Sequence, residues 1–354
     1  MTINLAVVGV GWAGSRHVEA IQEITGRTEA GQDPPLAVRT LVDSDPEHLA
    51  ARAKVYGVQH TVTELRGALE DPEIDAVSIA TPHHLHADQA IASAEAGKHV
   101  IVEKPMAVTV EDADRMISVA LANGVRLYVA ENVPYGSMTR TIRDIVRTGR
   151  YTGALSSATV LAGFRADTYG YPGRRAWLAQ PEFGGSGTWL LHGVHTVAQL
   201  RAIFGEVAIV HARESKTPDF SRPDLEGTMS CLLTMESGLN VLLVQSCETR
   251  FAPGQKGITL MGERGTVHAT EDAAIVRSAD IYPDLSDPLR VEYPAQEFTE
   301  YALEFLAFAD LIEKGITGPT SAESERMSLA VVQAGYESAE SGQPVNLKER
   351  FGTV

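Results

Sequence analysis

The chain has 354 residues, which is long enough for two domains that each bury a core. Hydrophobic residues make up 44% and charged residues 21% of the sequence, and this balance excludes a disordered or fibrous protein. Acidic residues outnumber basic ones by 46 to 30, so the formal net charge of -16 repels nucleic acid and anionic membranes. A small anionic ligand is still allowed, because a helix N-terminus or an arginine reverses the potential locally.

Cysteine usage and the absence of long apolar runs indicate where the protein works. Cys231 and Cys247 both lie in apolar, strand-like runs, which favours buried thiols in a reducing compartment. The apolar start Ile3–Val10 has no basic leader or cleavage site and continues directly into glycines, as an opening strand does. No window approaches the roughly 20 apolar residues that span a bilayer. We therefore expect a soluble, cytoplasmic protein.

The first 130 residues alternate β-rich runs with helical patterns, which predicts an α/β domain with a doubly wound parallel sheet. A polar stretch, Thr25–Pro35, reads as a surface insertion between the first helix and the second strand. The predicted strands are Leu5–Val8, Val38–Val42, Ala76–Ala80, His99–Val102 and Arg126–Val129, and the predicted helices are Ser15–Ile24, Pro46–Val55, Ala87–Ala96 and Val110–Ala122.

Residues 131–354 show a different pattern, in which strand-like runs follow one another without regular helices between them. This predicts an α+β domain with an open, mostly antiparallel sheet, and Ser237-Gly238 reads as the turn of a hairpin. The amphipathic stretch Glu323–Ser338 predicts a last helix that is able to pack back against the first domain. The predicted strands are Leu155–Leu161, Val207–Arg213, Gly227–Met235, Leu239–Cys247 and Gly257–Met261.

A glycine-rich segment joins the first strand to the first helix. In it, Gly9 permits a tight turn, Gly11 lets a pyrophosphate approach the backbone, and Gly14 lets helix and strand pack closely. Trp12 and Ala13 open the helix, whose N-terminus faces the phosphates of a bound dinucleotide. The same glycines would also suit any tight strand-to-helix turn, so the fingerprint needs support from elsewhere in the chain.

Asp43 supplies that support, because it ends the second strand, where a carboxylate accepts hydrogen bonds from the adenosine ribose. The insertion at Thr25–Pro35 accounts for its greater distance from the glycines. Alternatively, Asp43 caps the helix that begins at Pro46, although Ser44 or Asp45 could fill that role. A carboxylate repels the extra phosphate of NADP and no arginine follows it directly, so we expect NAD as cofactor and NADP as the less favoured one.

Four motifs together resemble the Gfo/Idh/MocA oxidoreductases, a family that includes inositol, glucose and dihydrodiol dehydrogenases. The motifs are Ala94–Pro105 with its Glu-Lys-Pro, the loop Thr81–His86, the turn Gly184–Gly187 before Gly193-Val194-His195, and the tail Ala339–Leu347. The resemblance implies that residues 1–130 form an NAD-binding Rossmann domain and that residues 131–354 form a domain for substrate binding and oligomerisation. It also implies a homodimer or homotetramer.

The resemblance assigns Lys104 to catalysis, where its ammonium would bind a substrate oxygen and share its proton as hydride moves. The alternative is a surface lysine paired with Glu103. Glu103 is expected near the cofactor, and Thr81 and Pro82 are expected to line it. His86 would either approach the cofactor or simply open the following helix.

His195 is the second catalytic candidate, because an imidazole accepts or donates a proton near neutral pH. Its alternative role is a buried histidine of the core. Many members of the family carry an Asp four residues before this histidine, but Leu191 stands there in this sequence. His192 shares a helical face with His195 and is a third candidate, for catalysis or substrate binding.

Several aromatic and basic side chains are expected to border the substrate site, although they would serve equally well as interface core or solvated rim. They could stack on a sugar ring or bind an anionic group. We expect no metal, because the adjacent His83, His84 and His86 cannot converge on one ion and no carboxylate completes a ligand set. The candidate substrate residues are Asn132, Tyr135, Tyr169, Tyr171, Arg174, Arg175 and Trp177, together with Lys104, His192 and His195.

The sequence thus predicts an NAD(H)-dependent oxidoreductase that transfers a hydride between nicotinamide and a carbinol or ketone carbon of a sugar, polyol or cyclic diol. Two alternatives are a relative that retains NAD and cleaves a glycosidic bond, and a catalytically silent protein that binds NAD. The intact Lys104 weighs against the silent protein, whereas Leu191 keeps it open.

Overall fold

The computed structural model describes residues 2–29, 31–164, 176–184, 186–218, 220, 225–278 and 288–352. It divides into two compact units, Met1–Asn132 with Glu297–Arg326, and Val133–Gln296 with Met327–Val354. The sequence-based division placed all of 131–354 in the second domain, whereas the structure places Glu297–Arg326 in the first unit. The reason is an apolar helix within this segment, whose Phe305 and Phe308 are fully buried in the core of the first unit.

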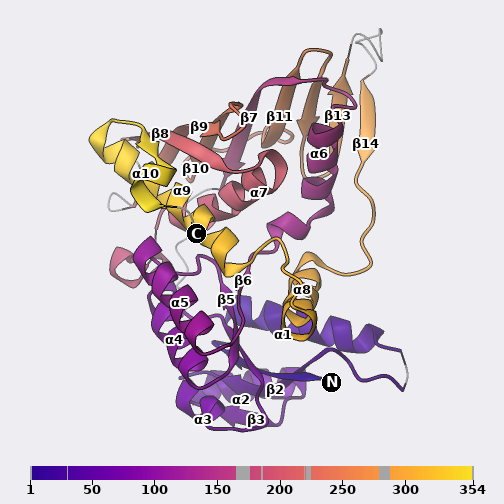
Figure 1. The fold of residues 1–354 in the computed structure, drawn as a ribbon, viewed down its shortest axis with the longest axis vertical. Helices are drawn as coiled ribbons and strands as arrows, with labels where there is room; N and C mark the ends of the chain where they lie inside the picture. Colours follow the sequence, from indigo (N-terminus) through magenta and orange to yellow (C-terminus); the bar gives the residue numbers. More distant parts are fainter. Residues whose placement is uncertain are drawn as a thin grey trace. The chain divides into compact units, whose positions relative to one another are not determined.

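The described part of the first unit contains a six-stranded parallel sheet, in the order β3-β2-β1-β4-β5-β6 (Figure 1). Its central strands are almost entirely buried, as expected for a parallel sheet covered on both faces. The five predicted strands are present, with ends shifted by at most two residues, whereas β3 was missed because it is short and polar. The strands are β1 (Ile3–Val8), β2 (Leu36–Val42), β3 (His60–Val62), β4 (Ala76–Ile79), β5 (His99–Glu103) and β6 (Leu127–Ala130).

Two helices of the first unit, α2 and α5, begin directly after residues whose side chains cap them. Asp45 accepts hydrogen bonds from two amides of α2, and Thr109 accepts one from the amide of Asp112 in α5. The first helix ends at Arg27, so the predicted insertion begins inside its last turn. The helices are α1 (Trp12–Arg27), α2 (Pro46–Tyr56), α3 (Leu65–Leu69), α4 (His86–Glu95), α5 (Val110–Ala122) and α8 (Glu300–Lys314), with a short helix η1 (His83–Leu85); α1 and α8 lie side by side (Figure 1).

The described part of the second unit is built on a nine-stranded sheet in the order β14-β13-β12-β11-β7-β10-β9-β8-β15. All described pairs are antiparallel except β10 with β7. The five predicted strands are present, and β9 and β10 form the predicted hairpin. The strands are β7 (Leu155–Gly163), β8 (Val207–Ser215), β9 (Thr228–Met235), β10 (Asn240–Ser246), β11 (Gly257–Gly262), β12 (Thr266–Ala269), β13 (Ala273–Arg277), β14 (Leu289–Glu292) and β15 (Val345–Asn346).

Apart from the helical face of His192 and His195, the sequence predicted one helix of the second unit, the amphipathic stretch Glu323–Ser338. That helix, α9, is longer than predicted; it begins in the segment assigned to the first unit and continues in the second, where the Trp189 indole donates to the carbonyl of Val332 at 2.8 Å. The helices are α6 (Ser137–Thr148), α7 (Val194–Phe204), α9 (Ala322–Ser341) and α10 (Leu347–Phe351), with short helices η2 (Val133–Tyr135), η4 (Ala176–Ala179), η5 (Pro181–Phe183) and the π-helix η6 (Trp189–Gly193).

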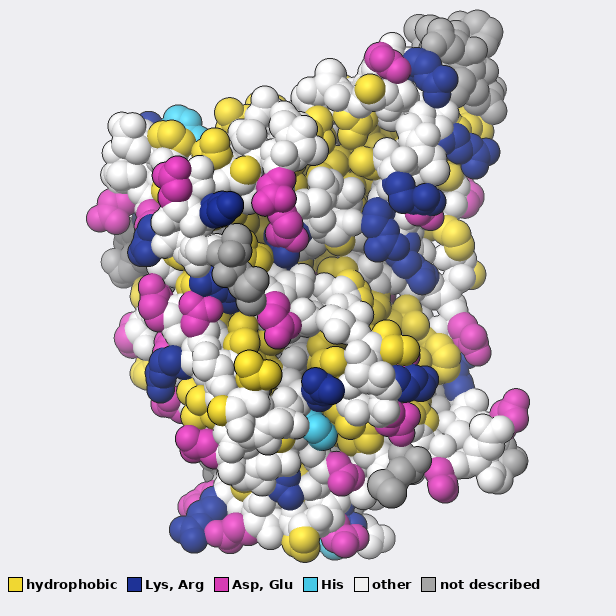
Figure 2. Space-filling view, in the orientation of Figure 1, with side chains coloured by type: hydrophobic (Ala, Val, Ile, Leu, Met, Phe, Trp, Pro, Cys, Tyr) yellow, Lys and Arg dark blue, Asp and Glu magenta, His cyan; other side chains and the backbone are white. Residues whose placement is uncertain are grey.

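Helix α6 is sharply two-sided. Ile142 and Ile145 are buried, while Arg140, Arg143 and Arg147 are exposed along the opposite side. Basic side chains accordingly gather over α6 in the space-filling view (Figure 2). The acidic net charge therefore coexists with a local basic surface.

Both cysteines are buried, as predicted. Cys231 lies in β9 and Cys247 directly follows β10. Burial raises the pKa of each thiol to about 12, so neither is a thiolate at neutral pH. Among the described helices, none combines the length and the apolar character required to cross a membrane.

Candidate active site

The glycine-rich turn between β1 and α1 leaves no room for side chains at two of its three glycines. Gly9 has a φ of 83°, and a Cβ added there would lie 2.7 Å from the carbonyl oxygen of Ala80. A Cβ added at Gly14 would lie 1.9 Å from the carbonyl oxygen of Gly9. A Cβ at Gly11 would meet nothing within 4 Å. Gly9 and Gly14 thus serve packing, while Gly11 leaves one side of the turn open.

The N-terminus of α1 is open in the same way. Gly11 is its N-cap residue, no side chain caps the first turn, and that turn carries no acidic residue. Amides at such a helix end attract an anion. Because no described side chain caps the first turn of α1, an anionic ligand is able to accept hydrogen bonds from its amides. Trp12 is 53% exposed, and the guanidinium of Arg16 lies over its ring at 5.6 Å.

Asp43 follows β2 and is 4% exposed. One of its carboxylate oxygens accepts from the amide of Val10 and the other from the amide of Asp45, both at 3.1 Å. Because Asp45 provides the cap of α2, the alternative role of Asp43 as that cap is wrong. Asp43 instead places its carboxylate directly against the glycine-rich turn. The turn, the helix end and this carboxylate fit a dinucleotide.

The Glu-Lys-Pro segment ends β5, and its glutamate is held from two sides. Glu103 accepts from its neighbour's amide, that of Lys104, at 3.2 Å, and pairs with Nε2 of His17 at 3.0 Å. His17 is fully buried in α1, and its Nδ1 lies 2.7 Å from the hydroxyl of Ser78. Lys104 is half-buried and is followed by a cis peptide bond to Pro105. Glu103 thus has a buried partner in His17.

A second buried carboxyl group lies on α8. Glu304 is 1% exposed, and neither of its side-chain oxygens has a hydrogen-bond partner among the described residues. Burial, and then the nearby carboxylates of Glu103 and Glu131, raise the pKa of Glu304 well above its usual value. Glu304 therefore keeps its proton to a higher pH than an exposed glutamate does. The sequence reading missed it, because one Glu in an apolar helical pattern gives no signal of burial.

We predict that Glu304→Gln stabilises the protein increasingly as pH rises. The raised pKa means that the folded state keeps a proton that the unfolded chain loses above its own pKa of about 4.3, so the free energy of unfolding falls with pH. The slope is at most about 1.4 kcal/mol per pH unit for one proton, up to the folded-state pKa. Glutamine has no proton to lose, so the advantage of the variant should grow as pH rises above about 4.3, until the folded-state pKa of Glu304 is reached.

Urea unfolding of both proteins at several pH values measures this difference. Glu313→Gln provides a matched control, because Glu313 is exposed on the same helix. A pH-independent difference between wild type and Glu304→Gln would contradict the raised pKa of Glu304.

His86 braces two loops at the end of the parallel sheet. Its ring is fully buried, with Nδ1 2.9 Å from the carbonyl oxygen of Pro105 and Nε2 2.9 Å from that of Thr81. Burial lowers its pKa, although the two carbonyls oppose this shift. The structure therefore favours the interpretation that His86 opens α4 and links these loops. Thr81 and Pro82 are half-buried in the loop after β4.

The histidine cluster around His86 offers no metal site. Its rings are used for structure, since His83 is also buried and stacks edge-on against His86. Across the described ranges, no group of three His, Cys, Asp or Glu side chains is arranged to hold a metal ion.

The expected substrate residues fall into different environments. Asn132 belongs to the first unit and donates to Glu300 at 2.9 Å, whereas Tyr135 is half-buried in η2 of the second. Trp177 packs against an apolar cluster with Leu178 and Cys247. The remaining aromatic and basic candidates, which are Tyr169, Tyr171, Arg174 and Arg175, lie outside the described residues.

A buried glutamate organises the turn before the two candidate histidines. The carboxylate of Glu226 accepts from the amide of Gly187 at 2.9 Å and from that of Trp189 at 2.7 Å, and the hydroxyl of Tyr336 donates to it at 2.9 Å. A Cβ at Gly187 would lie 1.8 Å from the carbonyl oxygen of Glu226, which explains a glycine at this position. The sequence reading missed Glu226, because its partners are far away in the chain.

His192 and His195 lie where η6 passes into α7. Both are half-buried, and their rings are 5.7 Å apart in an edge-on arrangement. Leu191 packs into the apolar cluster around Leu178 and Cys247, while its amide donates to the hydroxyl of Ser186 at 2.9 Å. A carboxylate at position 191 would therefore be placed among apolar side chains. The structure brings the two histidines together without an acidic partner at 191.

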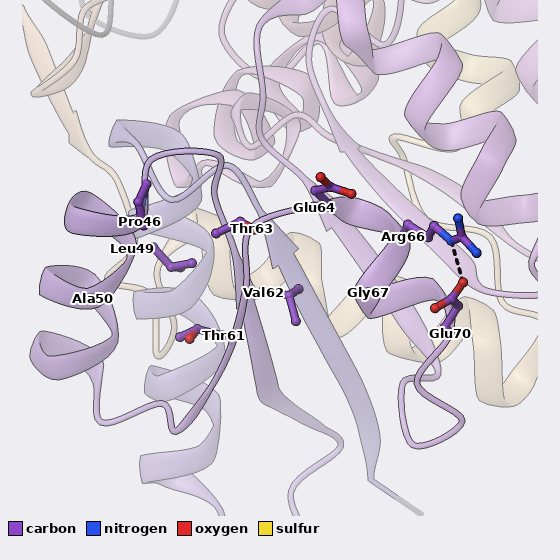
Figure 3. A pocket seen from close by; sticks show the side chains of 10 residues that line it. All are labelled: Pro46, Leu49, Ala50, Thr61, Val62, Thr63, Glu64, Arg66, Gly67 and Glu70. Atoms are coloured by element: carbon purple, nitrogen blue, oxygen red, sulfur yellow. Dashed lines mark hydrogen bonds and ion pairs between the residues drawn. The ribbon is translucent and has the colours of Figure 1, made fainter.

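One surface pocket adjoins Asp43, whose amide donates to the carbonyl of Val62 in the pocket lining at 3.3 Å. It has a volume of about 520 Å³ and is lined by α2, α3 and the end of β3, with the Arg66–Glu70 ion pair at its rim (Figure 3). None of the glycine-rich turn, Asp43, Lys104 or the two histidines lines it. We therefore assign it no role in the chemistry.

Comparison with known proteins gives an independent view of the chain. Residues 3–131 match the model described as "Oxidoreductase family, NAD-binding Rossmann fold", and residues 139–268 match the "GFO/IDH/MocA C-terminal domain". A levoglucosan dehydrogenase from Pseudarthrobacter phenanthrenivorans is 31% identical over 67% of this chain, and the match spans 60% of that enzyme's length.

Two further proteins are similar to this chain. A solved structure of levoglucosan dehydrogenase in complex with NADH and levoglucosan superposes with a TM-score of 0.83 over 98% of this chain and 100% of the other, at 23% identity, and shares its fold. An alpha-N-acetylgalactosaminidase from Shewanella oneidensis is 34% identical over 152 residues, which are 42% of this chain and 32% of that enzyme.

Proposed function

The chain belongs to the Gfo/Idh/MocA oxidoreductase family, and from this premise we propose that it is an NAD(H)-dependent dehydrogenase acting on a CH–OH group of a sugar, polyol or cyclic diol. One observation carries the proposal. The glycine-rich turn, Asp43, Thr81 and Lys104 follow β1, β2, β4 and β5, which are neighbours in one parallel sheet. Ligands of such sheets bind at the carboxyl ends of the strands.

The residues divide the work of binding the cofactor. The open side of Gly11 and the amides of α1 receive the pyrophosphate, with Trp12 and Ala13 in the same turn, and Asp43 accepts from the adenosine ribose. Thr81 and Pro82 border the nicotinamide end of the cofactor. Glu103 fixes the backbone of Lys104 by accepting a hydrogen bond from its amide. When bound, NAD supplies an acceptor for the hydride.

Lys104 handles the proton in this proposal. Its ammonium binds the substrate oxygen, and the amine form takes the hydroxyl proton as the carbon is oxidised. Lys104 is half-buried in the segment that follows β5. His195 is the second proton-transfer group, and His192 binds a further substrate oxygen.

Other side chains are proposed to contact the substrate. Tyr135 and Trp177 offer aromatic faces to a sugar ring, and Arg174 offers a cation. Asn132 supports the substrate side through its hydrogen bond to Glu300.

We predict that Asp43→Ser narrows the preference for NAD over NADP by roughly 10- to 100-fold, since hydrogen bonds to a charged group contribute about 1.5–3 kcal/mol and each 1.4 kcal/mol is tenfold. The ribose contacts weaken, and the repulsion of the extra phosphate disappears. The ratio of kcat/KM for the two cofactors measures this change. Asp45→Asn is the matched control, because it removes a nearby charge and keeps a good helix cap. A wild-type preference for NADP would contradict the assignment of Asp43.

A second candidate function is cleavage of a glycosidic bond with NAD retained, and the likeness to the alpha-N-acetylgalactosaminidase favours its inclusion. The two functions differ in their products. Purified protein with NAD and a panel of sugars, polyols, cyclic diols and hydroxy acids should accumulate NADH if it is a dehydrogenase. Release of sugar from a glycoside without NADH would favour the second function. NAD binding without turnover of either kind would favour a silent NAD-binding protein.

We also propose that the protein is a homodimer or homotetramer, located in the cytoplasm. Three large apolar side chains, Leu161, Leu232 and Leu242, are 37%, 41% and 48% exposed on the neighbouring strands β7, β9 and β10. An exposed apolar patch on a sheet supports self-association, and the two buried thiols suit a reducing compartment. Sedimentation of the purified protein measures the oligomeric state, and a monomer at micromolar concentration would contradict it.

A further inference from the structure

A buried glutamine lies directly behind one of the two candidate histidines. Gln245, in β10, is 0% exposed, and its side-chain amide contacts three side chains of the segment that carries the histidines. Its Oε1 accepts from the hydroxyl of Thr196 at 2.8 Å. Its Nε2 lies 3.2 Å from the hydroxyl oxygen of Thr188 and 3.3 Å from Nδ1 of His192. Both threonines are buried as well.

These contacts use nearly all the hydrogen-bonding capacity of the amide. A glutamine amide has two N–H donors and one carbonyl oxygen. The two donors of Gln245 serve Thr188 and His192, and its oxygen is engaged by Thr196. In the orientation that the structure shows, each polar atom of this buried amide has a partner, and these contacts stabilise that orientation.

The orientation decides where the proton of His192 lies. An amide nitrogen donates and never accepts, so Nδ1 of His192 must be the acceptor. In a neutral imidazole, one nitrogen accepts and the other carries the proton. The proton of His192 therefore lies on Nε2. A doubly protonated ring would direct an N–H against an N–H of the buried amide.

We propose that Gln245 is a positioning residue that holds His192 as a neutral Nε2–H donor, which binds an oxygen of the substrate and does not accept its proton. The inference rests on the proposed function for its substrate, while the tautomer itself does not depend on it. It divides the two histidines between roles: His192 selects a substrate with an acceptor oxygen, and the proton transfer falls to Lys104 and His195. Leu191 has no polar group that could orient an imidazole. The neutral amide of Gln245 orients the ring of His192 instead.

The tautomer is measurable without any substrate. Long-range 1H–15N spectra of protein labelled with 15N-histidine distinguish the Nε2–H form, the Nδ1–H form and the imidazolium, and His192→Gln assigns the His192 signals by their loss. We expect wild type to show the Nε2–H form between about pH 6 and pH 8, where an unperturbed histidine would titrate. The Nδ1–H form, or an imidazolium at neutral pH, would overturn the inference.

Two variants test the role of Gln245. Gln245→Glu presents a carboxylate of the same shape, which should draw a proton to Nδ1 and raise the pKa of His192. Gln245→Leu should release the ring into a mixture of tautomers. Gln199→Leu is the matched control, because Gln199 lies on α7 and donates to Thr139 instead. Unchanged His192 signals in both Gln245 variants would overturn the inference.

Kinetics separates this inference from the proposed function. With a substrate that the enzyme oxidises, Gln245→Leu should raise KM by up to about tenfold, the size of one neutral hydrogen bond, and change kcat much less. A fall in kcat of the same size, at unchanged KM, would show that His192 acts in proton transfer. It would overturn the assignment of His192 to substrate binding. If the Nε2–H form is found but no substrate is oxidised, the proposed function fails and the tautomer stands.

Discussion

Lys104→Ala should lower kcat by about 10²–10⁴-fold, the usual contribution of a general acid or base, and leave the affinity for NAD nearly unchanged. The ammonium is assigned to the substrate oxygen and its proton, whereas the glycine-rich turn and Asp43 hold the cofactor. Steady-state kinetics at saturating NAD measures the first effect, and titration of NADH fluorescence measures the second. His195→Asn should cost less, because no carboxylate at position 191 stabilises its imidazolium.

The outcome for Lys104 can contradict the account in two ways. A variant that loses cofactor affinity but keeps kcat at saturating NAD would place Lys104 on the cofactor instead of the substrate. A His195→Asn variant with the larger loss of kcat would make His195 the principal proton-transfer group. Lys54→Ala is the control, because Lys54 is exposed on α2.

Gly14→Ala should destabilise the protein by about 1–3 kcal/mol or more, as expected for overpacking, and remove most of its NAD affinity. Its added methyl would lie 1.9 Å from the carbonyl oxygen of Gly9, so α1 must move away from the turn. Gly11→Ala is the matched variant, because the same methyl meets no protein atom within 4 Å. We expect Gly11→Ala to fold with nearly normal stability. Its affinity for NAD should nevertheless be low, because the methyl occupies the space assigned to the pyrophosphate.

Thermal unfolding and NAD titration of the two variants separate packing from binding. Normal NAD affinity in Gly11→Ala would show that the pyrophosphate does not pass this residue. Normal stability and normal affinity in Gly14→Ala would show that the turn tolerates a shift of α1.

Much of the fold was predictable because hydrophobic periodicity reports buried strands and amphipathic helices directly. The parallel strands are apolar runs, and α5 begins at its predicted residue because Thr109 caps it there. Strand β3 was missed because it has three residues with polar side chains at the edge of the sheet. The packing of α8 on α1 was missed because the contact joins Phe305 to residues far away in the sequence.

The candidate site was predictable where a motif is local, and unpredictable where partners are distant. The glycine-rich turn and Asp43 have roles that follow from their places after β1 and β2. Glu226, Gln245 and Glu304 carry no local signal, since their burial and partners depend on tertiary packing. The role of Asp43 as a helix cap could not be excluded from the sequence, because its neighbour Asp45 fits equally well until the hydrogen bonds are seen.

Hydride transfer from substrate to NAD is tested most directly with a labelled hydrogen. Sugars and polyols that support NADH formation are supplied with deuterium on their carbinol carbons, and the reduced nicotinamide is examined by mass spectrometry. We expect wild type to transfer the deuterium to NAD in one step with ketone formation, and Lys104→Ala to slow this transfer. Reduced nicotinamide without the label, or no reduction with any member of the panel, would contradict the assignment of this chain as an NAD-dependent dehydrogenase of hydroxylated substrates.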